Sequence, residues 1–347
     1  MKLFSAQGVV LGGVLLCLAV PSHAVVLKQK WQPGQKLAYS LDLDGTANVQ
    51  LPPGAPGMDL FAGVPLEVQM NGKGTASFDT LKVDEFGTGT VAVSVPQLKL
   101  NALTLGQKAQ LTLSDGKSQL SINGQPINIG ALPQGDGKPT TALKFSANGQ
   151  FKGIEPIGDG AKAAPPAATQ TPATPAQAVN QTSILWETIL KSFPALWPAR
   201  DVKTGDTWQA NVDFAPLARP ATGDAPAKPL GAFDLKLEGE DVLGGKTLQR
   251  VSIKGDLDLD GKTLETAFPT PPATATPAPN ARRAQAQPKL DHATQTVEGT
   301  LWFDAGAGQV AKAELVLGGR AQAITPNAKD KSWIDFTGTL NMALQSK

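Results

Sequence analysis

Hydrophobic and polar residues alternate with a period of two along most of this chain. The alternation is clear over residues 37–44, 91–95 and 233–237, and apolar or small residues keep one phase over residues 334–344. Successive side chains of a strand point to opposite faces of a sheet, so this pattern predicts strands with one buried face and one wet face.

Turn-forming pairs separate these runs. They are Asn71-Gly72, Asp115-Gly116, Asn123-Gly124, Asn148-Gly149, Gly244-Gly245 and Asp260-Gly261. Asn-Gly and Asp-Gly pairs supply the positive φ angles of tight hairpins, which join antiparallel strands. The regular alternation of strands and helices that builds a parallel sheet is absent from the pattern.

One segment follows a helical period instead. In residues 183–193, Trp186, Leu190 and Phe193 fall at i, i+4 and i+7, and Pro194 ends the run. This spacing predicts an amphipathic helix of about three turns that packs on a sheet, with residues 183–198 as the packing segment.

Two tracts hold too few large apolar residues to form a core, which predicts disorder at residues 158–182 and 269–287. We therefore expect an all-β fold with two similar antiparallel domains, each a curved sheet or open barrel. The first domain spans residues 25–157, and residues 158–182 form the linker. The second domain spans residues 199–347 and contains the disordered insert.

The two halves share an order of four blocks, which indicates an internal repeat. Residues 33–39 correspond to 204–210, and each block opens a strand. Pro/Gly-rich inserts follow at residues 52–65 and 216–229. The third and fourth pairs are hairpin segments, residues 87–95 with 244–253 and residues 143–150 with 301–309.

The first 24 residues have the layout of a secretory signal peptide. Lys2 supplies a positive start, residues 9–20 form a short apolar core, and small residues precede the expected cleavage after Ala24. The apolar core is shorter than the roughly 20 residues of a membrane span. We expect a protein of the periplasm or the extracellular space without a stable transmembrane segment.

Cleavage after Ala24 would remove Cys17, the only cysteine, and His23, one of two histidines. A chain without cysteine forms no disulfide, and one histidine cannot build a structural zinc site. The 31 basic and 30 acidic residues are balanced and form no basic block, which argues against a nucleic-acid partner. We expect no cofactor and no metal.

Two motifs resemble ligand loops but fail in detail. Residues 256–261 begin like a calcium loop, yet Ala267 stands where the bidentate glutamate belongs, so alternation favours a strand. Residues 239–247 and 261–263 resemble phosphate-binding loops, but Glu240 and Asp256 stand where the first glycine is needed. Both segments are interpreted as hairpins.

Candidate catalytic groups are few. Histidine commonly serves as a general base near neutral pH, which makes His292 a candidate. The chain lacks the G-x-S-x-G elbow of a serine hydrolase, however, and we interpret His292 as solvated. Carboxylate pairs such as Asp42 with Asp44, or Asp84 with Glu85, fit exposed strand faces and turns. We predict no catalytic residue and no enzymatic activity.

The first strand opens with a P-G-x-x-L-x-Y pattern, Pro33 to Tyr39, and a later one with G-D-x-W, Gly205 to Trp208. In these motifs the chain resembles uncharacterised exported bacterial proteins. The resemblance implies an all-β protein of the cell envelope and brings no site residues.

Curved sheets of this kind commonly enclose an apolar cavity on the concave side. The leading hypothesis is a non-catalytic binding module for a lipid or other apolar molecule. The alternatives are an envelope scaffold that binds a protein and, third, an enzyme with a pocket of titratable residues.

Overall fold

The structure is a computed structural model that describes residues 24–50, 65–114, 117–127, 139, 141–157, 196–212, 231–261, 289–324 and 332–345. The expected signal peptide, except Ala24, lies outside the described residues. So do the linker at 158–182, the inserts at 216–229 and 269–287, and nearly all of the insert at 52–65. Of the helix expected at 183–198, only residues 196–198 are described.

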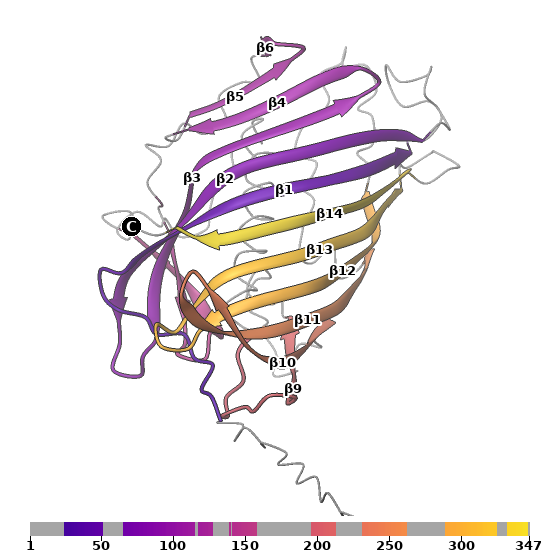
Figure 1. The fold of residues 1–347 in the computed structure, drawn as a ribbon. Coiled ribbons are helices and arrows are strands. Elements are labelled where there is room, and N and C mark those ends of the chain that lie inside the picture. The colour runs from indigo at the N-terminus through magenta and orange to yellow at the C-terminus, as the bar shows by residue number, and fades with distance from the viewer. Residues whose placement is uncertain are drawn as a thin grey trace, which may run out of the picture.

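Strands make up most of the described chain (Figure 1). In chain order they are β1 (Lys36–Gln50), β2 (Leu66–Val83), β3 (Gly89–Thr104), β4 (Gln107–Ser114), β5 (Lys117–Ile122), β6 (Gln125–Ile127), β7 (Thr141–Phe145), β8 (Phe151–Pro156), β9 (Thr207–Val212), β10 (Gly231–Leu243), β11 (Lys246–Asp260), β12 (Lys289–Asp304), β13 (Gln309–Ile324) and β14 (Ser332–Leu344).

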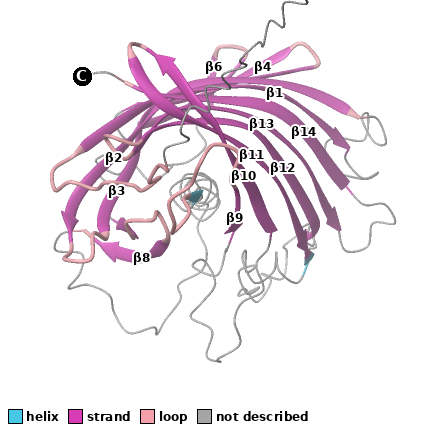
Figure 2. Cartoon of the chain, turned by 60° about the horizontal axis from the view of Figure 1, so that its bottom comes forward, coloured by secondary structure: helices cyan, strands magenta, loops and turns pink. Residues whose placement is uncertain are grey.

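These strands form one 14-stranded antiparallel sheet. Its main path has the order β6-β5-β4-β3-β2-β1-β14-β13-β12-β11-β10-β9, and β7, which pairs with β3, and β8, which pairs with β7, lie off this path. The sheet curves into an arch that does not close, with β8 on one side and β9 on the other (Figure 2). The expectation of an all-β, antiparallel, strongly curved fold is confirmed.

The two halves of the chain meet where β1 pairs with β14. Their register runs from Tyr39 opposite Leu344 to Gln50 opposite Trp333 without a break. The first and last long strands of the protein are therefore neighbours, and both halves belong to the same sheet.

The matched blocks that open β1 and β9 have the same local geometry. Gly34 and Gly205 both have positive φ angles, 77° and 91°. The amide of Gly34 donates to Thr80 (2.8 Å), whose own amide donates to Gln35 (2.8 Å). In the second half, Gly205 and Asp206 make the equivalent two bonds with Leu237, at 2.7 and 3.0 Å. The internal repeat itself remains a prediction, which this likeness supports.

β3 divides the sheet at one edge. Its first residues, 89–92, pair with β7, while residues 97–104 pair with β4. The β7–β8 hairpin therefore lies near the start of β3, and the β4–β5–β6 meander lies near its end. Trp31 from the segment before β1 stacks on Phe145 of β7, with ring centroids 5.8 Å apart.

The main core lies at this end of the arch, which we call the base. Segments outside the sheet fill it, because Leu27 and Val202 are fully buried and the Val25 and Val202 backbones are bonded to each other (2.8 and 3.0 Å). Trp197 packs on Phe303 with ring centroids 4.4 Å apart. The core is thus sealed by residues 24–35 and 196–206 as well as by strands.

One predicted turn is wrong. Asn71-Gly72 lies inside β2, where Asn71 pairs with Asp44 and Gly72 with Leu43. Gly72 faces the concave side, and a Cβ there would collide with Leu100 of β3. This glycine leaves room for the Leu100 side chain rather than making a turn. The predicted hairpins at Asn123-Gly124, Asn148-Gly149 and Gly244-Gly245 are confirmed, and Asp115-Gly116 lies outside the described residues.

Candidate ligand-binding face

The concave side of the arch is apolar along its whole length but is not equally buried. In β1 the inward-facing residues Leu37, Tyr39 and Leu41 are all less than 10% exposed, whereas Leu43 and Val49 beyond them are half-buried. β14, its neighbour, repeats the change: Leu340 is buried, whereas Ile334 is 44% exposed. Apart from the small side chain of Ala47, which is buried, burial of the inward-facing residues therefore falls from the base toward the opposite end, which we call the mouth.

The same change occurs in the other long strands. We call the inward-facing, incompletely buried apolar residues of the mouth half the open face. They are Leu43, Val49, Leu66, Val68, Met70, Leu100, Leu111, Leu120, Ile122, Leu259, Leu317, Ile334 and Phe336.

No charged side chain interrupts the open face among the described residues. The inward-facing positions between its apolar residues are occupied by glycine, alanine, serine, threonine and glutamine, such as Ala102, Thr104, Ser118 and Gln295. An apolar surface without a counter-charge favours an uncharged group of a ligand, because burying an unpaired charge is strongly unfavourable.

A row of inward-facing glycines lets the arch bend so tightly. A Cβ on Gly45 would lie 2.6 Å from the backbone oxygen of Thr337, and one on Gly338 would lie 2.6 Å from that of Asp44. Similar collisions would occur at Gly74, Gly231, Gly255 and Gly299. Glycine in a strand commonly marks a tight bend or a close backbone approach. The row crosses the arch at the level where the base gives way to the open face.

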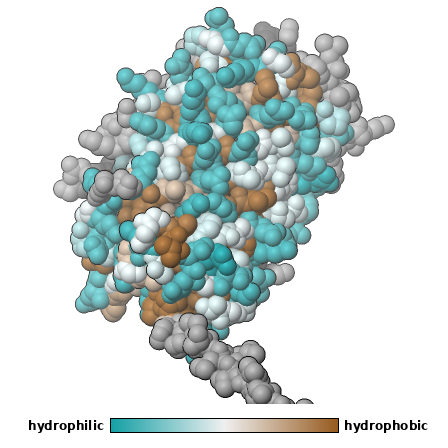
Figure 3. Space-filling model, viewed as in Figure 1, coloured by the Kyte–Doolittle hydropathy of each residue, from teal (hydrophilic) through white to brown (hydrophobic). Residues whose placement is uncertain are grey.

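The convex side is mainly polar. Asn101 donates to Asn71 (2.7 Å) and accepts from Gln110 (2.7 Å), which forms an amide ladder across β2, β3 and β4. Arg320 pairs with Asp335 through two bonds and thereby lowers the pKa of that carboxyl. Figure 3 shows this side, with broad hydrophilic areas and separate hydrophobic patches. Val316 of β13, 53% exposed, faces this side.

The sequence candidates for catalysis lie on this convex side or in turns. Asp256, Asp258 and Asp260 alternate with the buried or half-buried Leu257 and Leu259 along β11, so the strand interpretation is confirmed. His292 of β12 is 2.6 Å from Asp258 through its Nε2 atom, and both side chains are solvent-accessible.

Two of the candidate carboxylates, Asp42 and Asp84, make contacts within the fold. Asp42 forms an ion pair with Lys73 (3.2 Å) on the outward side of β1. Asp84 accepts hydrogen bonds from the amides of Phe86 (2.9 Å) and Thr88 (2.8 Å), and these bonds, led by the one from Thr88, lower its pKa. Within the described part of the chain, no group of three or more His, Cys, Asp or Glu side chains is placed to hold a metal ion.

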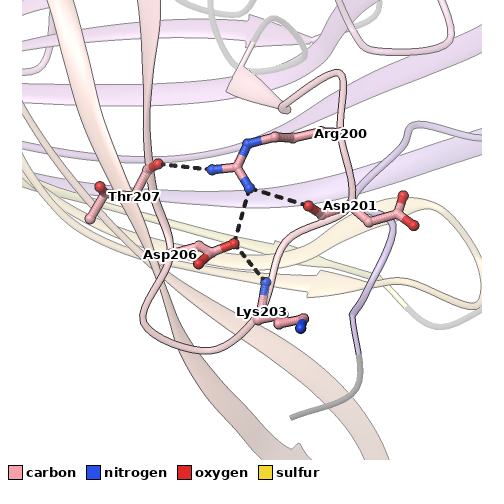
Figure 4. A network of polar contacts seen from close by, with 5 residues as sticks. All are labelled: Arg200, Asp201, Lys203, Asp206 and Thr207. Atoms are coloured by element: carbon pink, nitrogen blue, oxygen red, sulfur yellow. Dashed lines mark hydrogen bonds and ion pairs between the residues drawn. The ribbon is translucent and has the colours of Figure 1, made fainter.

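The G-D-x-W motif builds the corner that leads into β9 (Figure 4). The Asp206 carboxylate accepts hydrogen bonds from the amide of Lys203 (3.1 Å) and from the Arg200 guanidinium (3.1 Å). Both bonds lower the pKa of Asp206, and the bond from the Lys203 amide has the larger effect. Trp208 donates its indole hydrogen to the backbone oxygen of Leu196 (2.9 Å). The motif therefore fastens the 196–206 segment to the sheet.

No protein-family model matches the chain, and no curated protein matches it. Among the described residues, no helix has the length and apolar character that a membrane span requires.

Several solved structures are similar over most of the chain. One of them is lipovitellin, from a structure described as showing lipid–protein interactions. It is 11% identical to this chain, covers 91% of it, and has a TM-score of 0.41. The match covers 25% of the lipovitellin chain, which is much longer than this protein. A DUF1329 family protein from Desulfovibrio piger is 9% identical with a TM-score of 0.13, covering 90% of this chain and 86% of that one. OpdQ from Pseudomonas aeruginosa is 7% identical with a TM-score of 0.15, covering 90% and 98%. The function proposed below therefore rests on the chain's own residues.

Proposed function

We propose that this protein is an exported, non-catalytic binding module that holds an apolar, lipid-like ligand against the open face. The observation that carries the proposal is that inward-facing apolar side chains of one strand are buried at the base and more exposed toward the mouth. Leu340 and Ile334 have the same orientation in β14, yet Leu340 is 5% exposed in the base core whereas Ile334 is 44% exposed. The sheet extends well beyond what that core needs and presents apolar side chains there.

Covering the apolar side chains of the open face with a ligand is energetically favourable. Burying apolar area contributes about 25 cal/mol per Å², so a hydrocarbon ligand that covers a row of leucine side chains gains several kcal/mol. Contiguous exposed apolar patches on soluble proteins mark binding sites more often than chance would give. The mainly polar convex side supports the same assignment, in which the convex side faces water and the concave side holds the ligand.

The placement of titratable groups supports a binding role rather than a catalytic one. His292 and Asp258 contact each other on the convex side, and Asp42 is paired with Lys73 there. A general acid or base must lie within hydrogen-bond reach of the reacting group. None of these four side chains faces the concave side, where a ligand would bind.

The location belongs to the proposal as well. The signal-peptide pattern of residues 1–24 and the absence of cysteine after Cys17 fit a protein of the periplasm or the extracellular space. In such a compartment a lipid needs a protein surface to leave the membrane, because its hydrocarbon chain is unfavourable in water.

The proposal is tested by titrating the purified chain with a fluorescent apolar naphthylamine probe. Ile334→Lys places a charge on the open face, and Val316→Lys makes the same change on the convex side of the neighbouring strand. These two side chains are 44% and 53% exposed, which makes them a matched pair. We expect saturable binding that Ile334→Lys weakens at least about tenfold, because a charge is unfavourable in an apolar site, and that Val316→Lys leaves unchanged.

Absence of saturable binding by the unmodified protein would overturn the proposal, as would equal weakening by both variants. If the probe does not bind and crosslinking in intact cells recovers a partner protein, the scaffold function replaces the binding function.

A further inference from the structure

We infer that the open face takes the acyl chain of a single lipid molecule tail-first, with the base core as the floor and the headgroup in water at the mouth. The inference rests on the proposed function and deepens it, because it names the part of the ligand that is bound, its direction and its length limit.

The direction follows from the two ends of the concave side. At the base, fully buried side chains such as Leu301 and Phe303 leave no room to pass. At the mouth, Ile334 is 44% exposed, and the polar pair Arg320–Asp335 lies at the same end of the sheet. A ligand therefore enters at the mouth, and its far end stops at the floor.

The orientation of the ligand follows from charge. The open face has no charged residue among the described positions, so it offers no counter-charge to a phosphate, a carboxylate or an ammonium group. Burying such a headgroup unpaired would weaken binding by orders of magnitude. Only the hydrocarbon part of a lipid fits this surface without that cost, so the headgroup remains at the mouth.

The length of the face matches one acyl chain. From Leu43, just above the floor, to Val49 at the mouth, β1 advances six residues, which at about 3.4 Å per residue is roughly 20 Å. The hydrocarbon core of a bilayer is about 30 Å thick, so the chains of one leaflet extend about 15 Å. The open face is thus long enough to replace the leaflet around one chain.

The residues of the open face that lie next to the floor can be identified. Leu43 of β1 lies opposite Leu340 of β14 and Gly72 of β2, and Leu340 is buried. Leu317 of β13, opposite Gly338, lies at nearly the same depth from the neighbouring side. A larger side chain at Leu43 or Leu317 would raise the floor and shorten the part of the face that a chain can cover.

The test measures the affinity of the full chain for saturated fatty acids from octanoate to eicosanoate, each displacing the naphthylamine probe below its micelle concentration. Each added methylene should strengthen binding about fourfold while it is still buried. We expect this gain to stop once the chain reaches the floor. Leu43→Trp, or Leu317→Trp if the first variant does not fold, should move the plateau to shorter chains. The matched outward-facing variant Thr339→Trp should leave the plateau in place.

A second series keeps one chain length and changes the head from carboxylate to alcohol to amine. The inference predicts nearly equal affinities, because the head stays in water. A strong dependence on head charge, a gain that continues to the longest chain, or a plateau that Leu43→Trp and Leu317→Trp both leave in place would overturn it. If the probe binds but none of these ligands displaces it, the acyl-chain inference is wrong while the proposed function still stands. If the probe itself does not bind, the proposed function fails.

Discussion

Gly45 of β1 and Gly338 of β14 lie directly opposite each other on the concave side, at the seam between the two halves of the chain. A Cβ on either residue would lie 2.6 Å from a backbone oxygen of the other strand. The seam can bend into an arch because neither residue has a side chain. The glycine pair lies at the level where the packed base gives way to the open face.

We predict that Gly45→Ala destabilises the protein by about 1–3 kcal/mol, because the added methyl must displace backbone rather than a mobile side chain. Gly318→Ala is the matched control, since its Cβ would meet the hydroxyl of Thr296 at 2.8 Å, which can rotate away. Urea unfolding monitored by circular dichroism gives both midpoints. Equal losses would show that curvature at the seam does not depend on Gly45.

The core and the open face should respond differently to loss of an aromatic ring. Phe303 is 0% exposed in the base, so Phe303→Ala should cost about 3–5 kcal/mol. Phe336 of the open face is half-buried, so Phe336→Ala should cost less than about half as much. Urea midpoints measured without added ligand decide this. Equal costs would mean that the mouth half is packed as tightly as the base.

Sequence periodicity was sufficient for the strands but not for the site. The alternation of Leu37, Tyr39, Leu41 and Leu43 predicts one inward face, and the structure confirms it. Nothing in that pattern separates Leu41 from Leu43, because burial depends on residues 24–35 and 196–206, which reach the base from elsewhere in the chain.

Long-range pairing was equally hidden. The pairing of β1 with β14 joins residues from opposite ends of the chain, such as Tyr39 and Leu344, and no local pattern encodes that contact. Asn71-Gly72 looked like a turn because Asn-Gly pairs usually make one. Its glycine instead leaves room for the Leu100 side chain of β3, a tertiary requirement that outweighs the local preference.

Tyr39 is the only tyrosine and lies buried in the base, with its hydroxyl donating to the backbone oxygen of Val310 (2.9 Å). Burial raises its pKa well above the ordinary value of about 10. The folded state therefore holds this proton more tightly than the unfolded state, so its contribution to stability is present below pH 10 and is lost as pH rises further.

We predict that ultraviolet absorbance shows no tyrosinate in the folded protein at pH 10 to 11, and that ionisation accompanies unfolding at higher pH. Tyr39→Phe should lower the free energy of unfolding at pH 7 by about 1 kcal/mol, because it removes one buried hydrogen bond. Tyrosinate absorbance near pH 10 with the fold intact would contradict the buried placement.

The corner at Asp206 should make stability depend on acid. Hydrogen bonds from the Lys203 amide and Arg200 lower the pKa of Asp206, so this carboxylate stabilises the fold above its ordinary pKa of about 4 and less as pH falls through the lowered value. Asp206→Asn should lower the thermal midpoint at pH 7, and the difference from the unmodified protein should shrink toward pH 2. A difference that is constant with pH would argue against an ionised Asp206 at this corner.

The measurement that tests the central claim most directly is photolabelling of the purified full chain with a fatty acid that carries a diazirine on its acyl chain, followed by mass spectrometry of the labelled residues. The account predicts labels at inward-facing positions of the mouth half, such as Leu43 and Val49 in β1 and Ile334 and Phe336 in β14, and none at the intervening outward-facing positions. Labels on the convex side, or an even distribution over both faces of the same strands, would contradict it.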